Sequence, residues 1–424
     1  MEYNEEVTPL LPKPTTESFK DLKPHIKPVL ASFFISLVAG LNDGSIGTII
    51  PRLKQYYEIP NETISLLFLC SACGFFASAG LNGTIVHKLG QLKTLFLGST
   101  SMFVSFFILS WGFPFPVMIC VMPFVGGGMA LLDAAMNVYT ANLPLATLML
   151  NILHAVYGVG AMISPLVASF LLKYDVSWKG MYVFLTFIAI LNIIFIAFGF
   201  WNVDFGEAKE EESDNDGVDN YKENHKELTK KAIFNKVTLI GATYILIYVG
   251  VEVTLGGWGY SFLKEGRHGD EIAMAEVVSG YWAGLAAGRV ILGYLSGRFG
   301  EKLMITLFTM MTIGALFIMM VSENIILDST AFISIGLLLG PMFPTTISLA
   351  SKALPRSYHA TSIGFMAALG AGGAALFPFI TGQVAGKLGI LIMPIACIIM
   401  SIIMLVLWIF IPTDRPFFDA CLCS

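Results

Sequence analysis

Twelve long apolar stretches, separated by short segments rich in charge, proline and glycine, dominate the hydropathy pattern of this chain. Six lie in the first half, at 28–50, 64–86, 94–112, 116–141, 147–172 and 180–201. Six follow in the second half, at 237–263, 273–296, 303–321, 325–350, 357–385 and 388–411. Because a helix needs roughly 20 apolar residues to cross a bilayer, each stretch predicts one transmembrane helix. We therefore expect an all-α membrane protein.

The composition agrees with this interpretation. Hydrophobic residues make up 55% of the 424 positions and charged residues 13%, against roughly 25% charged in an ordinary soluble domain. The mean hydropathy is +0.74. So few charges cannot cover the surface of a water-soluble protein of this size, which excludes a soluble enzyme. The expected surroundings are therefore a lipid bilayer. The chain also lacks the basic face that binding to nucleic acid requires.

The clustering of charge predicts the domain boundaries. We expect a disordered cytoplasmic tail over 1–27, a six-helix bundle over 28–201, an acidic cytoplasmic linker over 202–236, a second six-helix bundle over 237–411 and a cytoplasmic tail over 412–424. The first tail and the linker together hold half of the 30 acidic residues. Charge at this density with little hydrophobicity is typical of disordered segments.

The positions of the basic residues predict the orientation. If the N-terminus is cytoplasmic, the cytoplasmic segments hold seventeen of the 25 lysines and arginines, and the opposite side holds seven. Cytoplasmic loops of membrane proteins carry an excess of these residues. Both termini are therefore expected in the cytoplasm.

An internal repeat appears at an offset of 210 residues. Gly83 and Gly90 are separated by six residues, and Gly293 and Gly300 repeat this spacing in the second half. Each pair follows a span rich in small residues. Two related six-helix halves are the plan of a transporter built from parallel repeats, with the solute site at the interface of the halves.

These two segments resemble the signature of the major facilitator superfamily, and the resemblance extends from about Pro28 to Pro412. The family's signature has two glycines that enclose an acidic and a basic residue. The positions that match it are Gly83, His87, Lys88 and Gly90 in the first copy and Gly293, Arg298 and Gly300 in the second. The resemblance implies that these residues form a gating motif, although both copies lack its acidic residue.

Five ionisable residues stand out deep within the predicted helices: Asp43, Asp133, His154, Glu252 and Arg289. A charge at the bilayer centre costs roughly 2.5–3.5 kcal/mol or more, so such residues are functional candidates. A carboxyl group in low dielectric is more easily protonated near neutral pH, which suits proton coupling. The alternative is structural, with an aspartate that ends a broken helix or pairs with Arg289 or His154.

The first two acids carry a closer resemblance, to the fucose:proton symporter branch of the family and its fungal relatives. That branch has an Asn-Asp pair in helix one, here Asn42 and Asp43, and an acid-x-Ala-x-Asn run in helix four, here Asp133 to Asn137. The resemblance implies that Asp43 and Asp133 couple protons. His154 lies near Asn151 and Tyr157 in sequence, which favours a functional role for it.

Aromatic residues are a second possible part of the site. Trp258 follows Glu252 within a glycine-rich run, where it is either a platform for a sugar ring or an interfacial anchor. The residues expected to bind solute are Asn42, Asn137, Asn151, His154, Tyr157, Glu252, Trp258 and Arg289.

These observations predict a secondary active transporter that moves a small polar solute by alternating access, with a sugar as the leading candidate. Transport is expected to be coupled to protons. One alternative is a uniporter or an organic-anion carrier in which Arg289 and His154 supply positive charge. Another is a membrane sensor or receptor that does not transport. No catalytic or metal-ligating motif is present, so we expect neither an enzyme nor a cofactor nor a bound metal.

The termini contain sorting signals. Glu6, Leu10 and Leu11 form an acidic dileucine pattern, which predicts a sorting adaptor as partner and a vacuolar or endosomal membrane, with the plasma membrane as the alternative. Cys421 and Cys423 are candidate lipidation sites. The protein is expected to be a monomer.

Overall fold

The computed structural model describes residues 21–203, 227–355 and 358–411, and within these ranges the ordered elements are all helices. The first half contains α1 (Ile26–Tyr57), α2 (Asn61–Ile64), α3 (Leu66–Leu89), α4 (Gln91–Ser110), α5 (Phe115–Ala141), α6 (Ala146–Lys173) and α7 (Lys179–Phe200). The second contains α9 (Lys236–Ser261), the π-helix η2 (Phe262–Gly266), α10 (Glu271–Phe299), α11 (Glu301–Val321), α12 (Ile325–Leu339), α13 (Met342–Ala353), α14 (His359–Leu388), η4 (Ile390–Ile392) and α15 (Met393–Phe410).

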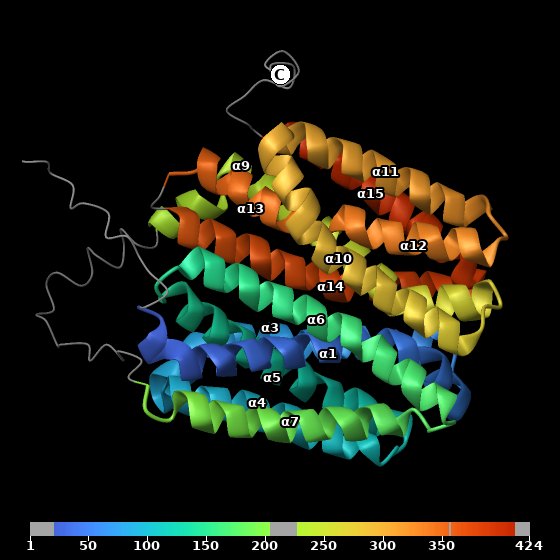
Figure 1. The fold of residues 1–424 in the computed structure, drawn as a ribbon, viewed down its shortest axis with the longest axis horizontal. Helices are drawn as coiled ribbons and strands as arrows, with labels where there is room; N and C mark the ends of the chain where they lie inside the picture. The colour runs from blue at the N-terminus through green and yellow to red at the C-terminus, as the bar shows by residue number, and fades with distance from the viewer. Residues whose placement is uncertain (1–20, 204–226, 356–357, 412–424) are drawn as a thin grey trace, which may run out of the picture.

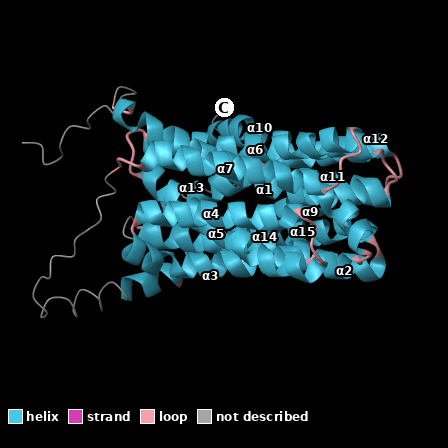
Figure 2. Ribbon diagram, turned by 90° about the horizontal axis from the view of Figure 1, so that it is seen from below, coloured by secondary structure: helices cyan, strands magenta, loops and turns pink. Residues whose placement is uncertain are grey.

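The long helices lie side by side along a common direction, with their connections at two ends (Figure 2). Figure 1 shows α1 and α3 to α7 on one side of the bundle and α9 to α15 on the other. We call the end that holds Ile26, Phe200 and Phe410 the terminal end. The end that holds Tyr57 and Glu271 is called the distal end.

Both halves pair their helices in the same way. In the first half α1 packs on α6, α3 on α5 and α4 on α7. In the second half α9 packs on α14, α10 on α12 and α11 on α15, which is the same pattern when α12 and α13 count as one span. Contacts of α6 with α10, α3 with α14 and α1 with α9 join the halves. The predicted fold class, two related six-helix bundles, is confirmed.

Within the described residues, eleven helices are long and apolar enough to cross a membrane. The twelfth, α10, has the required length, but Glu271, Glu276, Arg289 and Arg298 and several glycines make it less apolar. Large apolar side chains are exposed around the bundle, Phe170 and Phe198 among them. In a bilayer these side chains face lipid, and exposed apolar surface of this extent is unusual on a soluble monomer.

Two predicted spans differ from the structure. The hydropathy pattern ends the first span at residue 50, yet α1 continues through Pro51 to Tyr57. The span predicted at 325–350 is divided, because α12 ends at Leu339 and α13 begins at Met342. Pro341 lies at this break, where it has no backbone N–H to continue the hydrogen bonds of α12.

The repeated glycines end equivalent helices. Gly90 has φ 81° between α3 and α4, and Gly300 has φ 102° between α10 and α11. Residues with side chains rarely adopt such φ values, so glycine at both places permits the sharp turn. Gly83 and Gly293 have open space around them. His87, Lys88 and Arg298 are exposed at the terminal end, and Arg298 lies over the Phe299 ring.

Several predictions concern residues outside the described ranges. These are the first tail apart from residues 21–27, most of the linker, the second tail, the dileucine pattern at Glu6, Leu10 and Leu11, and the candidate lipidation sites Cys421 and Cys423.

Candidate functional site

A cavity of about 310 Å³ lies between the two halves, midway along α1 and α9. Helices α1, α3, α4, α5, α6 and α7 contribute to its wall from the first half, and α9 and α14 from the second. Its polar wall residues are Asn42, Asp43, Ser45, Ser71, Asp133, Tyr157, Tyr182 and Glu252. The remainder of the wall is largely apolar, with Phe68, Phe75 and Phe106 among its members.

Asp43 is exposed to this cavity and held by two hydrogen bonds. The Tyr157 hydroxyl donates to Asp43 Oδ2 at 2.7 Å, and Asn42 Nδ2 donates to Asp43 Oδ1 at 2.9 Å. The first bond joins α6 to α1. It depends on close packing, because a Cβ atom at Gly40 would collide with the Tyr157 carbonyl oxygen. Glycine at this position therefore brings the two helices within hydrogen-bonding distance.

Asp133 on α5 lies in the same wall and is half-buried. Asn137, one turn later on the helix, donates through Nδ2 to Asp133 Oδ1 at 3.0 Å and to its backbone oxygen at 2.9 Å. Within the described chain, neither Asp43 nor Asp133 forms an ion pair with a lysine, arginine or histidine. Two carboxyl groups thus face the cavity without a cation as partner.

Glu252 supplies the third carboxyl group of the wall and differs from the other two. Its Oε1 atom lies 3.3 Å from Arg289 Nη2, so α9 and α10 are joined by an ion pair. The Tyr281 hydroxyl also donates to the Glu252 backbone oxygen at 2.9 Å. Glu252 is buried, and Arg289 is not among the residues of the cavity wall.

Other residues expected to bind solute lie outside the wall. Asn151 and His154 are exposed on α6. Trp258 is fully buried, and its Nε1 donates to the Pro378 backbone oxygen at 2.9 Å. Asn137 contributes through its bonds to Asp133. The structure therefore brings together Asn42, Asp43, Asp133, Tyr157 and Glu252.

Some wall residues were not expected from the sequence. Ser45, Ser71 and Tyr182 line the cavity, as do small residues of α14 such as Ala371. A serine in an apolar helix carries no signal of its own. The alanine- and glycine-rich run at 370–375 is the one feature that could have indicated a closely approached surface.

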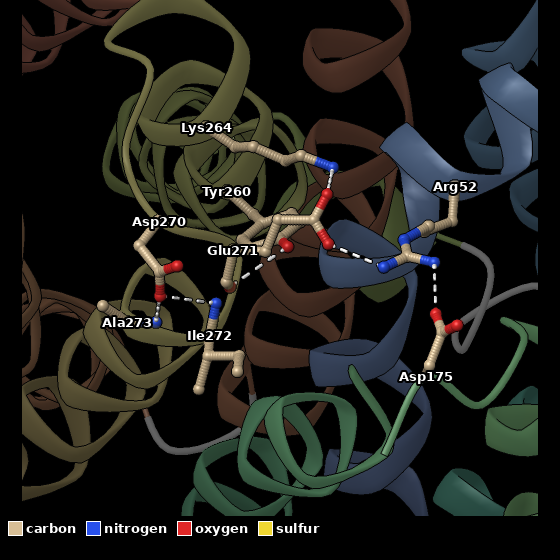
Figure 3. A network of polar contacts seen from close by, with 8 residues as sticks. All are labelled: Arg52, Asp175, Tyr260, Lys264, Asp270, Glu271, Ile272 and Ala273. Atoms are coloured by element: carbon tan, nitrogen blue, oxygen red, sulfur yellow. Dashed lines mark hydrogen bonds and ion pairs between the residues drawn. The ribbon is translucent and has the colours of Figure 1, made fainter. Parts of the chain in front are cut away.

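Ion pairs join the two halves at the distal end (Figure 3). Arg52 on α1 contacts Glu271 at the start of α10, with Nη2 and Oε2 2.7 Å apart. Lys264 on η2 pairs with the same carboxylate, and Asp175 lies 3.9 Å from Arg52. Lys54 and Glu265 form a second inter-half pair at 2.7 Å.

Further contacts reinforce this connection between the halves. Gln383 on α14 donates to the Glu62 backbone oxygen at 2.8 Å and to Ser65 Oγ at 3.0 Å. The η2 segment that carries Lys264 is itself fixed, because Arg267 next to it donates to Asp328 Oδ2 on α12 at 2.7 Å. Asp328 is fully buried, although its place near the edge of a predicted span gave no sign of this role.

Comparison with known proteins adds independent information. A family model described as the Major Facilitator Superfamily matches residues 32–378 and 243–421. Bypass of stop codon protein 6 of Saccharomyces cerevisiae is 26% identical, over 91% of this chain and 82% of that protein. The glucose/mannose transporter GlcP of Bacillus subtilis is 22% identical, over 81% of this chain and 84% of that protein.

A solved structure has a similar fold. The crystal structure of a D-xylose-proton symporter aligns with a TM-score of 0.74 and 13% sequence identity. The alignment covers 92% of this chain and 98% of the other. At this identity the likeness concerns the arrangement of the helices alone.

Proposed function

This chain belongs to the Major Facilitator Superfamily, a family of membrane transporters and not of enzymes, and on this premise we propose that it carries a monosaccharide together with protons by alternating access. The observation that carries the proposal is the pair of carboxyl groups, Asp43 and Asp133, that face a cavity between the halves without a cation as partner.

The cavity suits a small, uncharged, polar solute. Its volume of about 310 Å³ lies at the small end of the roughly 300–1,000 Å³ typical of ligand pockets. Carboxyl, amide and hydroxyl groups occupy part of the wall, where they can bind the hydroxyls of a sugar. Aromatic side chains occupy another part, where the apolar face of a sugar ring can pack. The relative GlcP is named a glucose/mannose transporter, which favours a hexose.

Proton coupling follows from the cost of unpaired charge. An ionised carboxylate in a cavity of low dielectric is unfavourable unless a cation or several hydrogen bonds compensate it. Asp43 accepts two hydrogen bonds, and Asp133 accepts one from Asn137. Binding a proton relieves the remaining charge, and a solute that binds better to the neutral site is then carried together with that proton.

Alternating access gives the ion pairs at the distal end a role. Ion pairs from Arg52 and Lys54 hold the halves together there. Exposure of the cavity to the distal side requires these pairs to break, and closure of the terminal end would follow. On this proposal the conformation with these pairs formed opens its cavity toward the terminal end, and the excess of basic residues there predicts that this end faces the cytosol.

The alternatives find less support. An organic-anion carrier needs positive charge in the cavity, yet the wall residues include no lysine, arginine or histidine. Arg289 is paired with Glu252, and His154 lies outside the wall. A uniporter could use the two carboxyl groups to bind sugar hydroxyls, but it would not need them to bind and release protons, so the uptake experiment below distinguishes it. No observation specifically favours a sensor that does not transport.

Uptake into proteoliposomes tests the proposal. The purified full chain is reconstituted, and entry of radiolabelled D-glucose is measured with and without an inwardly directed proton gradient. We expect the gradient to drive accumulation and a protonophore to abolish it. Uptake that equilibrates glucose without accumulation would identify a uniporter. Absence of uptake with every neutral hexose would overturn the sugar assignment.

A further inference from the structure

We propose that Glu252 sets the charge selectivity of the cavity by neutralising Arg289, so that the site accepts uncharged sugars and rejects sugar acids. This inference rests on the proposed function for the choice of solute. It assigns to Glu252 a specificity role distinct from the proton-coupling role of Asp43 and Asp133.

Glu252 both lines the cavity and pairs with a positive charge that does not line it. Its side chain lines the wall, and its carboxylate contacts the Arg289 guanidinium at 3.3 Å. Arg289 is not a wall residue, and its side chain is 21% exposed. Of this pair, a solute in the cavity therefore contacts the Glu252 side chain and not the Arg289 guanidinium.

Two further contacts keep this arrangement in place. The Tyr281 hydroxyl donates to the Glu252 backbone oxygen, which ties α10 to α9. Ser279 on α10 also donates to the Met162 backbone oxygen on α6 at 2.8 Å. Arg289 is thus carried by a helix that is held on two sides, and its guanidinium stays within reach of Glu252.

The charges around the cavity explain why Glu252 would control which solutes the cavity accepts. Its wall contains the carboxyl groups of Asp43, Asp133 and Glu252 and no cationic side chain. With Asp43 and Asp133 protonated as proposed above, an anionic solute finds no free positive charge in the wall to compensate its own, and an uncompensated charge is unfavourable in a site of low dielectric. Arg289 is the cation that contacts the wall, and Glu252 offsets its charge. A buried guanidinium that loses its carboxylate is left with an uncompensated charge.

Replacement of the carboxylate by an amide therefore changes the net charge of the pair from zero to positive. Glu252→Gln has nearly the same size and shape, but it leaves the charge of Arg289 directed at the cavity. A sugar carboxylate can then pair with the guanidinium in the place of Glu252. Removal of Arg289 in the same chain should cancel the gain, because no cation remains to attract the anion.

Isothermal titration of the purified full chain with D-glucuronate and D-glucose tests the inference. These probes share a ring and differ in one carboxylate. We expect wild type to bind glucose and to reject glucuronate. Glu252→Gln should increase the affinity for glucuronate by about tenfold or more, and Glu252→Gln/Arg289→Gln should return it to the wild-type level.

The outcomes separate the two proposals. Unchanged glucuronate affinity in Glu252→Gln, or a gain that persists in the double variant, would overturn the role of Glu252. Failure of wild type to bind glucose or another neutral hexose would count against the sugar assignment, while the glucuronate comparison would still decide the role of Glu252. Should Glu252→Gln not give a folded, monodisperse protein, Glu252→Ala tests the same expectation, since it also removes the carboxylate.

Discussion

The Tyr157 hydroxyl on α6 donates a 2.7 Å hydrogen bond to the Asp43 carboxylate on α1, and so joins a proposed proton site to the helix that packs against the other half of the molecule. This bond fixes the orientation of Asp43 toward the cavity. Its partner residues are 114 positions apart in the sequence.

Tyr157→Phe should lower the rate of sugar uptake about tenfold, because a hydrogen bond to a charged group contributes roughly 1.5–3 kcal/mol. Uptake should remain dependent on the proton gradient, since Asp43 is still present. Initial rates in proteoliposomes measure this effect. A Tyr157→Phe protein that loses proton dependence altogether would instead place the hydroxyl on the proton path.

Asp133→Asn should abolish the accumulation of sugar driven by the proton gradient. Exchange of sugar between the two sides of the membrane should continue. The amide retains size and can still hydrogen-bond Asn137, but it binds no proton in this range of pH. Asp133→Glu is the matched control and should retain accumulation. Gradient-driven accumulation by Asp133→Asn at the wild-type level would exclude Asp133 as a coupling residue.

Arg52→Gln should open the distal end more often. Each partly exposed ion pair contributes up to about 1 kcal/mol, so loss of the contacts with Glu271 and Asp175 should shift the open population by several-fold. The reporter is maleimide labelling of Ile64→Cys, a buried position at the distal end, in a chain without its native cysteines.

The control for this experiment is Lys231→Gln, which removes the exposed pair with Glu227 at the terminal end. It should leave the labelling rate unchanged. Equal labelling of the Arg52→Gln and Lys231→Gln proteins would show that the Arg52 network does not hold the distal end closed.

Gly40→Ala should destabilise the protein and reduce transport. The added Cβ atom would collide with the Tyr157 backbone oxygen, and overpacking of this kind costs about 1–3 kcal/mol. Gly83→Ala is the control, because nothing lies within 4 Å of the added atom. Thermal unfolding in detergent should show a lower midpoint for the first variant and an equal or higher midpoint for the second.

Much of the fold could be predicted from hydropathy alone. An apolar span that crosses a bilayer must satisfy its own backbone hydrogen bonds, so it folds as a helix unless it is part of a closed barrel. Scarcity of charge within the spans likewise singles out Asp43, Asp133, Glu252 and Arg289. What the sequence leaves open is which charges meet. Arg289 could have paired with either aspartate, and helix packing rather than spacing decides in favour of Glu252.

The ion pairs at the distal end were not predictable either, because helix packing and not sequence spacing decides which charges meet. Arg52 and Glu271 are 219 positions apart, and both read as ordinary residues at the edge of a membrane span. Their contact depends on how the halves lie relative to each other. Trp258 is a different case, because an aromatic residue among glycines suits a binding wall and a packed core equally well, and its burial places it in the core.

The identical helix pairing within each half has a mechanical consequence. The most extensive packing joins helices of the same half. Either half can therefore rotate as a rigid body while the packing inside it stays the same. The side chains at Arg52, Lys54 and Gln383 then add to the resistance that the packing of α6 on α10 offers to this rotation. On the proposed mechanism, small changes of solvent or sequence at the distal end would therefore change the rate of the transport cycle, although these side chains lie far from the solute.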